Sequence, residues 1–259
     1  MAALSIGKAW EESVAFVKRE GQLLFPVALL FLAVPFAILF QMMPAEYLAM
    51  TPGQTKIPPL PPTVKLGMMV TAIITLAGSL TLYALALKPG ISVGEAIRLG
   101  VQRLPVLIGA ALIAALGYLM GVVLLSLVAG LLSVVIGAPA AVTLATIVLV
   151  PLLIYIIARL ILLNAVVIDR NDGLIASLRA AWMLTAGHVW RLIAFIIVLI
   201  VISSIIQMAV QAVFGVIGGL AGGPEAARAT GDFAVAATSA VIQIYFQVMT
   251  ARIYRQLNG

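Results

Sequence analysis

Long apolar stretches alternate with short polar segments along the whole chain. Six stretches of about 20 residues or more lie near residues 22–43, 66–87, 104–128, 140–163, 189–214 and 232–253. An α-helix needs about 20 apolar residues to cross the hydrocarbon core of a bilayer, whereas a spanning β-strand shows shorter segments of alternating hydrophobicity. The pattern predicts an all-α, polytopic membrane protein with six transmembrane helices in a single domain, residues 1–259.

The composition agrees with this interpretation. Hydrophobic residues make up 64% of the chain, charged residues make up 9%, and the mean hydropathy is +1.22, whereas about 25% of a soluble domain is charged. The chain has no cysteine, which excludes disulfides and thiol chemistry. A net charge of +6 could indicate a nucleic-acid partner in a soluble protein, but membrane topology explains the basic residues better, and we expect no nucleic-acid partner.

The basic residues are distributed unequally between the two sides that six spans define. Of the 15 Lys and Arg residues, three fall on the side opposite the termini: Lys56, Lys65 and Arg228. The other 12 share the side of the termini: Lys8, Lys18, Arg19, Lys88, Arg98, Arg103, Arg159, Arg170, Arg179, Arg191, Arg252 and Arg255. By the positive-inside rule, we expect a multi-pass protein of the bacterial cytoplasmic (inner) membrane with both termini in the cytoplasm.

The connections on the opposite side differ in length. Residues 44–65 are rich in proline, which favours extended, polyproline-like backbone and predicts a stiff, exposed connector. The other two connections, near residues 129–139 and 221–231, are short and rich in Gly, Ala and Ser.

A short amphipathic segment precedes the first, third and fifth apolar stretches. Residues 5–10 (SIGKAW) resemble residues 92–97 (SVGEAI) at an offset of 87, and a further offset of 81 leads to the third copy. The aligned positions have the spacing of one helical face: Ile6, Trp10, Val14 and Val17; Val93, Ile97, Val101 and Leu104; Leu174, Leu178, Trp182 and Thr185.

The repeated segments predict three pseudo-repeats, at about residues 1–87, 88–168 and 169–259. Each would consist of a cytoplasmic interfacial amphipathic helix followed by two spans. Ser92 and Glu95 have the spacing of a capping box, and Asn171 or Asp172 would cap the third interfacial helix.

No catalytic constellation is evident in the sequence. The single histidine, His188, has no accompanying histidine, cysteine or carboxylate pair, so we expect an interface residue rather than a general base or metal ligand. We predict no enzymatic activity, no metal and no cofactor. The candidate contacts with anionic lipid headgroups or a partner are the basic and aromatic residues near the cytoplasmic interface: Arg98, Arg103, Arg159, Arg179, Trp182, Trp190 and Arg191.

Four glutamines form the second candidate site. Gln207 with Gln211, and Gln243 with Gln247, are i, i+4 pairs on the fifth and sixth stretches. Such a polar seam could hold two helices together by hydrogen bonds or line a polar cavity. Arg159, the one basic residue placed well inside a span, could snorkel to phosphate or pair with Asn164, with a glutamine of the sixth stretch or with a bound anionic lipid.

The segment 164–193 resembles the cytoplasmic signature of the glycerophosphoryl diester phosphodiesterase membrane-domain family and of related YciC-like bacterial proteins. The matching residues are Asp172, Gly173, Ser177, Arg179, Trp182, Thr185, Gly187, Trp190 and Arg191. The resemblance implies a six-span membrane domain. In fused members the phosphodiesterase activity belongs to a separate soluble barrel. We expect no such barrel in residues 1–259, so the resemblance implies no such activity here.

Two hypotheses for function follow. The first is a non-enzymatic integral membrane protein that organises or senses lipid or a partner protein at the cytoplasmic face, with membrane lipids and a protein partner or a second copy as the expected partners. The alternative is a small transporter or channel for a lipid or small solute that uses the polar seam between the fifth and sixth spans.

Overall fold

The computed structural model describes residues 4–44, 47 and 59–259 of the chain, and every regular element in this part is a helix. The helices are α1 (Ile6–Ala28), the π-helix η1 (Leu29–Ala33), α2 (Val34–Met42), α4 (Pro62–Leu87), α5 (Val93–Ile136), α6 (Ala138–Leu160), α7 (Leu163–Asp169), α8 (Leu174–Leu184) and α9 (Val189–Asn258). Most of the proline-rich connector lies outside the described residues. Its last residues, from Pro62, form the first turn of α4.

Among the residues that the structure describes, five helical stretches are long and apolar enough to cross a membrane: Ile6–Met42, Pro62–Leu87, Val93–Ile136, Ala138–Asp169 and Val189–Asn258. The last one is a hairpin, because Gly222 and Gly223 have non-helical backbone and Thr230 Oγ1 donates a hydrogen bond to the Phe214 carbonyl at 3.0 Å. The two antiparallel limbs of α9, residues 189–221 and 224–258, contain the fifth and sixth predicted stretches.

The predicted lengths of the connections at 129–139 and 221–231 are wrong, because both connections are much shorter in the structure. α5 continues to Ile136, and the chain reverses at Gly137, whose φ of 84° lies in the left-handed region. The reversal in α9 occupies Gly222 and Gly223, and φ of Gly223 is 78°. In each case proline follows within two residues, at Pro139 and Pro224. Glycine permits the turn and proline starts the next helix, so the flanking Ala and Ser residues remain helical.

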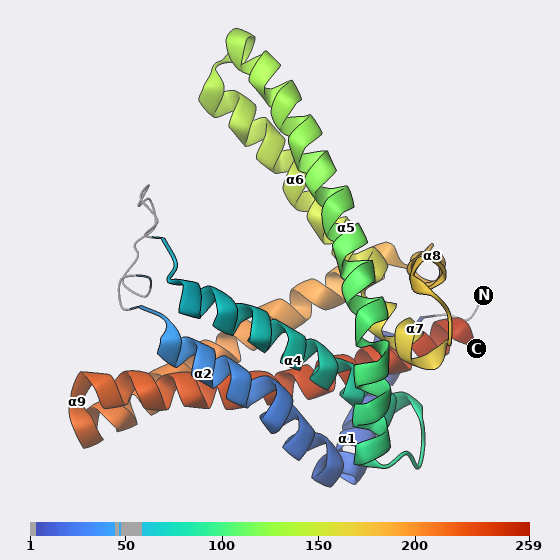
Figure 1. Ribbon diagram of the computed structural model, residues 1–259, viewed down its shortest axis with the longest axis vertical. Coiled ribbons are helices and arrows are strands. Elements are labelled where there is room, and N and C mark those ends of the chain that lie inside the picture. Colours follow the sequence, from blue (N-terminus) through green and yellow to red (C-terminus); the bar gives the residue numbers. More distant parts are fainter. Residues whose placement is uncertain (1–3, 45–46, 48–58) are drawn as a thin grey trace.

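The core lies where three helix ends meet. Most residues are buried in 80–87 at the end of α4, in 162–168 around α7 and in 244–254 near the end of α9. Tyr254 Oη donates to the Asp169 carboxylate at 2.6 Å, and Arg255 donates to the Leu87 carbonyl, so the end of α9 contacts both other ends. The start of α1 and the end of α9 both lie at this common end, where Ser5 contacts Gln256 (Figure 1).

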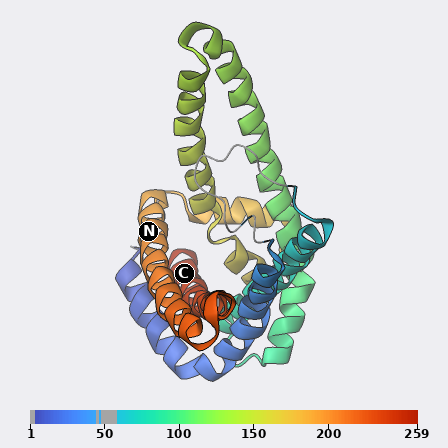
Figure 2. The ribbon, with the colours of Figure 1, turned by 90° about the vertical axis from the view of Figure 1, so that its left-hand side faces the viewer.

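The helices diverge away from the common end. The hairpin of α5 and α6 projects from the rest of the molecule (Figures 1 and 2). No residue from 111 to 136 is buried, and Leu131 and Val134 are 76% and 87% exposed. In water such apolar exposure would be costly, whereas lipid tails solvate it.

The interfacial helices begin where the sequence alignment places them. α1, α5 and α8 start at Ile6, Val93 and Leu174, which are the aligned first positions of the three segments. The capping box of Ser92 and Glu95 is confirmed. The predicted cap of the third segment is wrong, because Gly173 occupies the N-cap position and no side chain caps this end.

The three interfacial segments differ in how they join the following helix. The first continues through α1 and η1 into α2, and the second is the first part of α5. The third, α8, is a separate helix, because the chain turns at Gly187, whose φ of 81° favours glycine.

Candidate functional site

Each interfacial helix buries a pair of small residues four positions apart. The pairs occupy aligned positions and all six residues are buried: Ala9 and Ser13, Ala96 and Gly100, Ser177 and Ala181. Small residues at this spacing allow two helix backbones to approach closely. The predicted apolar positions are only partly on the buried face. Val17 and Thr185 are buried, whereas Trp10, Val101 and Trp182 are 47%, 51% and 39% exposed.

Two of these helices pack against a long helix that precedes them in the chain. A Cβ added at Gly100 would lie 2.9 Å from Thr81 Oγ1, so α5 lies directly against α4. At the next junction Thr185 Oγ1, at the end of α8, donates to the Arg159 carbonyl of α6 at 3.1 Å. The two contacts join α5 to α4 and the end of α8 to α6.

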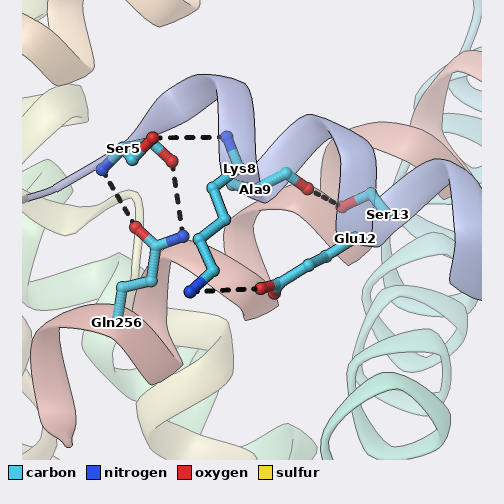
Figure 3. Close-up of polar contacts among 6 residues, drawn as sticks. All are labelled: Ser5, Lys8, Ala9, Glu12, Ser13 and Gln256. Carbon is cyan, nitrogen blue, oxygen red and sulfur yellow. Dashed lines mark hydrogen bonds and ion pairs between the residues drawn. The ribbon is translucent and has the colours of Figure 1, made fainter.

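The first interfacial helix packs in the same way against the last helix. The Ser5 backbone N–H donates to Gln256 Oε1 at 3.0 Å, and Gln256 Nε2 donates to the Ser5 carbonyl at 3.3 Å (Figure 3). Ser5 also caps α1, since its Oγ accepts the Lys8 N–H at 3.3 Å. Arg191 Nη1 donates to the Leu4 carbonyl at 3.3 Å. These contacts close the three junctions into a ring.

In two of the three junctions an arginine lies over an aromatic ring. The Arg159 guanidinium is 4.3 Å from the Trp182 ring centroid and 5.8 Å from that of Tyr155, and Arg159 is 7% exposed. The Arg252 guanidinium, on α9, lies 4.7 Å from the Phe16 ring of α1. Both Nε atoms are buried and have no hydrogen-bond partner within the described residues. The stacked ring faces attract these desolvated cations.

Arg159 therefore has neither of the protein partners that the sequence suggested. Asn164 Nδ2 donates instead to Ser79 Oγ at 3.2 Å, and the glutamines lie elsewhere. The Trp182 ring covers the guanidinium, so this candidate pair, Arg159 and Trp182, is brought together by the fold.

The remaining interfacial candidates are spread over the surface of the common end. Arg98, Arg179 and Arg191 are exposed, Arg103 is half-buried, and Trp190 is 81% exposed. Arg179 lines an open cavity of about 810 Å³ beside α8, together with Arg170 and His188. The four arginines share a location at one end of the molecule, but they do not contact a common side chain.

Within the described residues, no hydrogen bond joins the four glutamines of the predicted seam to one another. Gln247 is 2% exposed and its Oε1 has no hydrogen-bond partner within the described residues, whereas Gln207 and Gln243 are half-buried and Gln211 is exposed. The Gln211 amide packs against Gly231, where an added Cβ would lie 2.7 Å from Nε2. None of the four glutamines lines the cavity beside α8 or the cavity between α1 and the ends of α4 and α9.

The fold brings together a group of basic residues that no sequence motif indicates. Arg19, Lys88, Arg252 and Arg255 line a cavity of about 340 Å³ between α1, the end of α4 and the end of α9. These residues lie far apart in the sequence and form no local motif. The only available signal was their assignment to the same side of the membrane.

The signature-like segment 164–193 has a structural role. Ser177 and Thr185 are buried, Trp182 covers Arg159, and Gly187 makes the turn from α8 to α9. These residues hold α8 against α6. Within residues 4–44, 47 and 59–259, no three His, Asp or Glu residues come close enough to hold a metal ion.

The fold and its common end define an all-helical protein whose long apolar helices are compatible with a membrane. The chain belongs to a family described as a domain of unknown function (DUF7847), whose family model matches residues 4–257. No curated protein and no solved structure matches the chain. The family description includes no activity, and the similarity to the phosphodiesterase membrane-domain family stays a prediction.

Proposed function

We propose that this protein is a non-enzymatic six-span protein of the bacterial inner membrane that binds anionic lipid through its cytoplasmic face. The six spans are counted with the two limbs of α9 taken separately. The platform is the ring of three interfacial helices, each the first element of a pseudo-repeat. A protein partner would use the same surface.

The observation that carries the proposal is the repeated architecture of the common end. Three helices start at aligned residues and bury small pairs against the core. Arg98 of α5, Arg179 of α8 and Arg191 in the first turn of α9 are exposed at the same end of the molecule. Basic residues beside apolar spans attract anionic headgroups, and each contributes about 1 kcal/mol near a negatively charged surface. The aromatic Trp190 beside Arg191 is typical of a membrane interface.

The orientation is supported by the contacts at each end of the molecule. Residues near both termini contact each other through Ser5 and Gln256, and their end of the molecule holds most of the basic residues. At the other end, Arg228 donates to the Met43 carbonyl at 3.5 Å, which brings the α9 turn beside the end of α2. The positive-inside rule then assigns the common end to the cytoplasm.

Quenching of tryptophan fluorescence by brominated lipids tests the proposal. The protein is reconstituted in vesicles that contain phosphatidylcholine and phosphatidylglycerol, with bromine on one lipid or the other. We expect stronger quenching by brominated phosphatidylglycerol. We further expect the triple variant Arg98→Gln, Arg179→Gln and Arg191→Gln to lose this preference several-fold, because three headgroup contacts are removed.

The matched control is Lys65→Gln, which removes one positive charge at the start of α4, at the opposite end from the platform. The preference should survive in this variant, and it should weaken in high salt for the unmodified protein. Equal quenching by the two lipids in the unmodified protein would refute lipid binding by the platform.

The transport alternative receives no comparable support. A path along the glutamines needs a hydrated cavity that they share, and Gln247 is instead buried beside Ile244 and Val248 in the apolar core.

A further inference from the structure

The basic cavity at the first junction lies at the edge of the core. Its basic residues are Arg19 of α1, Lys88 at the end of α4, and Arg252 and Arg255 of α9. Lys88 begins the turn Lys88–Pro89–Gly90–Ile91, in which Gly90 has a φ of 79° and the Ile91 N–H donates to the Lys88 carbonyl at 3.4 Å. This turn fixes the position of the lysine beside α9.

The charges in the cavity are unbalanced. Its one carboxylate, Glu20, is paired with Arg19, whose Nε lies 2.8 Å from Oε1. No carboxylate of the described residues is within salt-bridge distance of Lys88, Arg252 or Arg255. Three cations therefore line one cavity with no carboxylate at salt-bridge distance, and the charge of Glu12 acts on Arg252 only from farther away. Repulsion disfavours this arrangement unless an anion binds.

The corresponding junction at Arg159 serves as an internal comparison. Both arginines lie over an aromatic ring and both have a buried, unpartnered Nε. Arg159 is enclosed by Trp182 and Tyr155 and is 7% exposed, so it has no room for a ligand. Arg252 instead borders the cavity of about 340 Å³, which is large enough for a phosphate group.

The cavity wall also has an apolar part. Leu23, Leu24 and Leu85 line it beside the basic residues, and Leu23 is 42% exposed. A free inorganic anion gains nothing from this surface. A phospholipid would place its phosphate among the cations and its glycerol and first acyl carbons against the leucines.

We propose that this cavity is a specific site for the phosphate group of one anionic phospholipid. Arg252 and Arg255 donate hydrogen bonds to the phosphate oxygens, Lys88 supplies a point charge, and Phe16 holds the Arg252 guanidinium in place. Arginine suits this role because its planar guanidinium matches two phosphate oxygens. The site rests on the proposed cytoplasmic orientation, but it uses residues other than the exposed arginines of the platform.

Native mass spectrometry of the full chain in detergent tests the site. Phosphatidylglycerol is added to delipidated protein, and inorganic phosphate is added in a parallel experiment. We expect one tightly retained phosphatidylglycerol per chain and no comparable retention of inorganic phosphate. The double variant Arg252→Gln and Arg255→Gln should weaken retention by about tenfold or more, because hydrogen bonds to charged groups are lost.

Two further variants keep the test independent of folding. Lys88→Gln lies in a turn outside the helices and should weaken retention by several-fold with an unchanged unfolding temperature, whereas Lys65→Gln should leave retention unchanged. Retention that is equal in the unmodified protein, the double variant and Lys88→Gln would overturn the proposal. So would binding of inorganic phosphate without phosphatidylglycerol.

The outcomes separate this site from the proposed function. If the cavity does not retain phosphatidylglycerol, the lipid preference measured by quenching should persist, since that preference depends on Arg98, Arg179 and Arg191. If the platform does not bind anionic lipid, the preference should be absent while one lipid per chain is still retained.

Discussion

Ser5 and Gln256 form a reciprocal pair of hydrogen bonds between the first and the last turns of the protein, with Ser5 N–H donating to Gln256 Oε1 at 3.0 Å and Gln256 Nε2 donating to the Ser5 carbonyl at 3.3 Å. The pair lies 251 residues apart in sequence. It places α1 on the end of α9 in the way that α5 lies on α4 and α8 lies on α6. The ring closes through the long helices, because α9 contacts α1 and also α4 and α6, on which α5 and α8 lie. The first helix is therefore not free.

Gln256→Ala tests this closure. Removal of two hydrogen bonds at an exposed position should lower the free energy of unfolding by about 1 kcal/mol. It should also release the start of α1, which limited proteolysis detects as faster cleavage before Lys18. Gln102→Ala, at an exposed position on α5, serves as the control. Unchanged cleavage in Gln256→Ala would show that the ring does not depend on this pair.

Trp182→Ala tests the aromatic cover of Arg159. The guanidinium would lose its main ring contact while still buried, so we expect a loss of about 1–3 kcal/mol in thermal or denaturant unfolding. Trp182→Phe keeps an aromatic face and should lose less. Trp190→Ala removes the same side chain from a position that is 81% exposed and should change stability by less than about 0.5 kcal/mol. Equal losses in the two alanine variants would contradict the assigned role.

Gly100→Ala tests the close contact of α5 with α4. The added Cβ would lie 2.9 Å from Thr81 Oγ1 and 3.1 Å from the Ala77 carbonyl, and such overpacking typically costs about 1–3 kcal/mol. This cost should exceed the gain in helix propensity. Gly117→Ala is the matched control in the same helix, because nothing lies within 4 Å of its added Cβ. It should be stabilising by about 0.5–1 kcal/mol. A stabilised Gly100→Ala would exclude the packing described here.

Cysteine labelling tests the topology, since the chain has no native cysteine. We expect Arg228→Cys to react with a membrane-impermeant maleimide in intact cells. Lys8→Cys and Arg98→Cys should react only after the membrane is permeabilised. The reason is that the proposed topology places the α9 turn outside and the interfacial helices in the cytoplasm. Labelling of Lys8→Cys and Arg228→Cys from the same side would exclude the five crossings that the proposal places between these residues.

The sequence by itself determined the class of fold. Apolar stretches of membrane-spanning length leave helices as the solution for backbone hydrogen bonding, and the structure is helical throughout its described part. Local signals were also sufficient at Ser92 and Glu95, because a capping box involves residues only three positions apart. The turns at Gly137 and Gly223 had a readable signal in the glycine and the proline that follows each of them.

Tertiary structure decided which face of each interfacial helix is buried. The large apolar residues Trp10, Val101 and Trp182 dominate the periodicity, yet the core accepts Ser13, Gly100 and Ala181, because only small side chains let the helices meet closely. It also decided that Arg19, Lys88, Arg252 and Arg255 share one cavity. Arg19 lies on α1, Lys88 follows α4, and Arg252 and Arg255 lie near the end of α9. Sequence periodicity describes one helix at a time, so it cannot predict that these residues meet. Helix ends that are distant in sequence meet only in the folded protein, where the hydrogen bonds between Ser5 and Gln256 join the start of α1 to the end of α9.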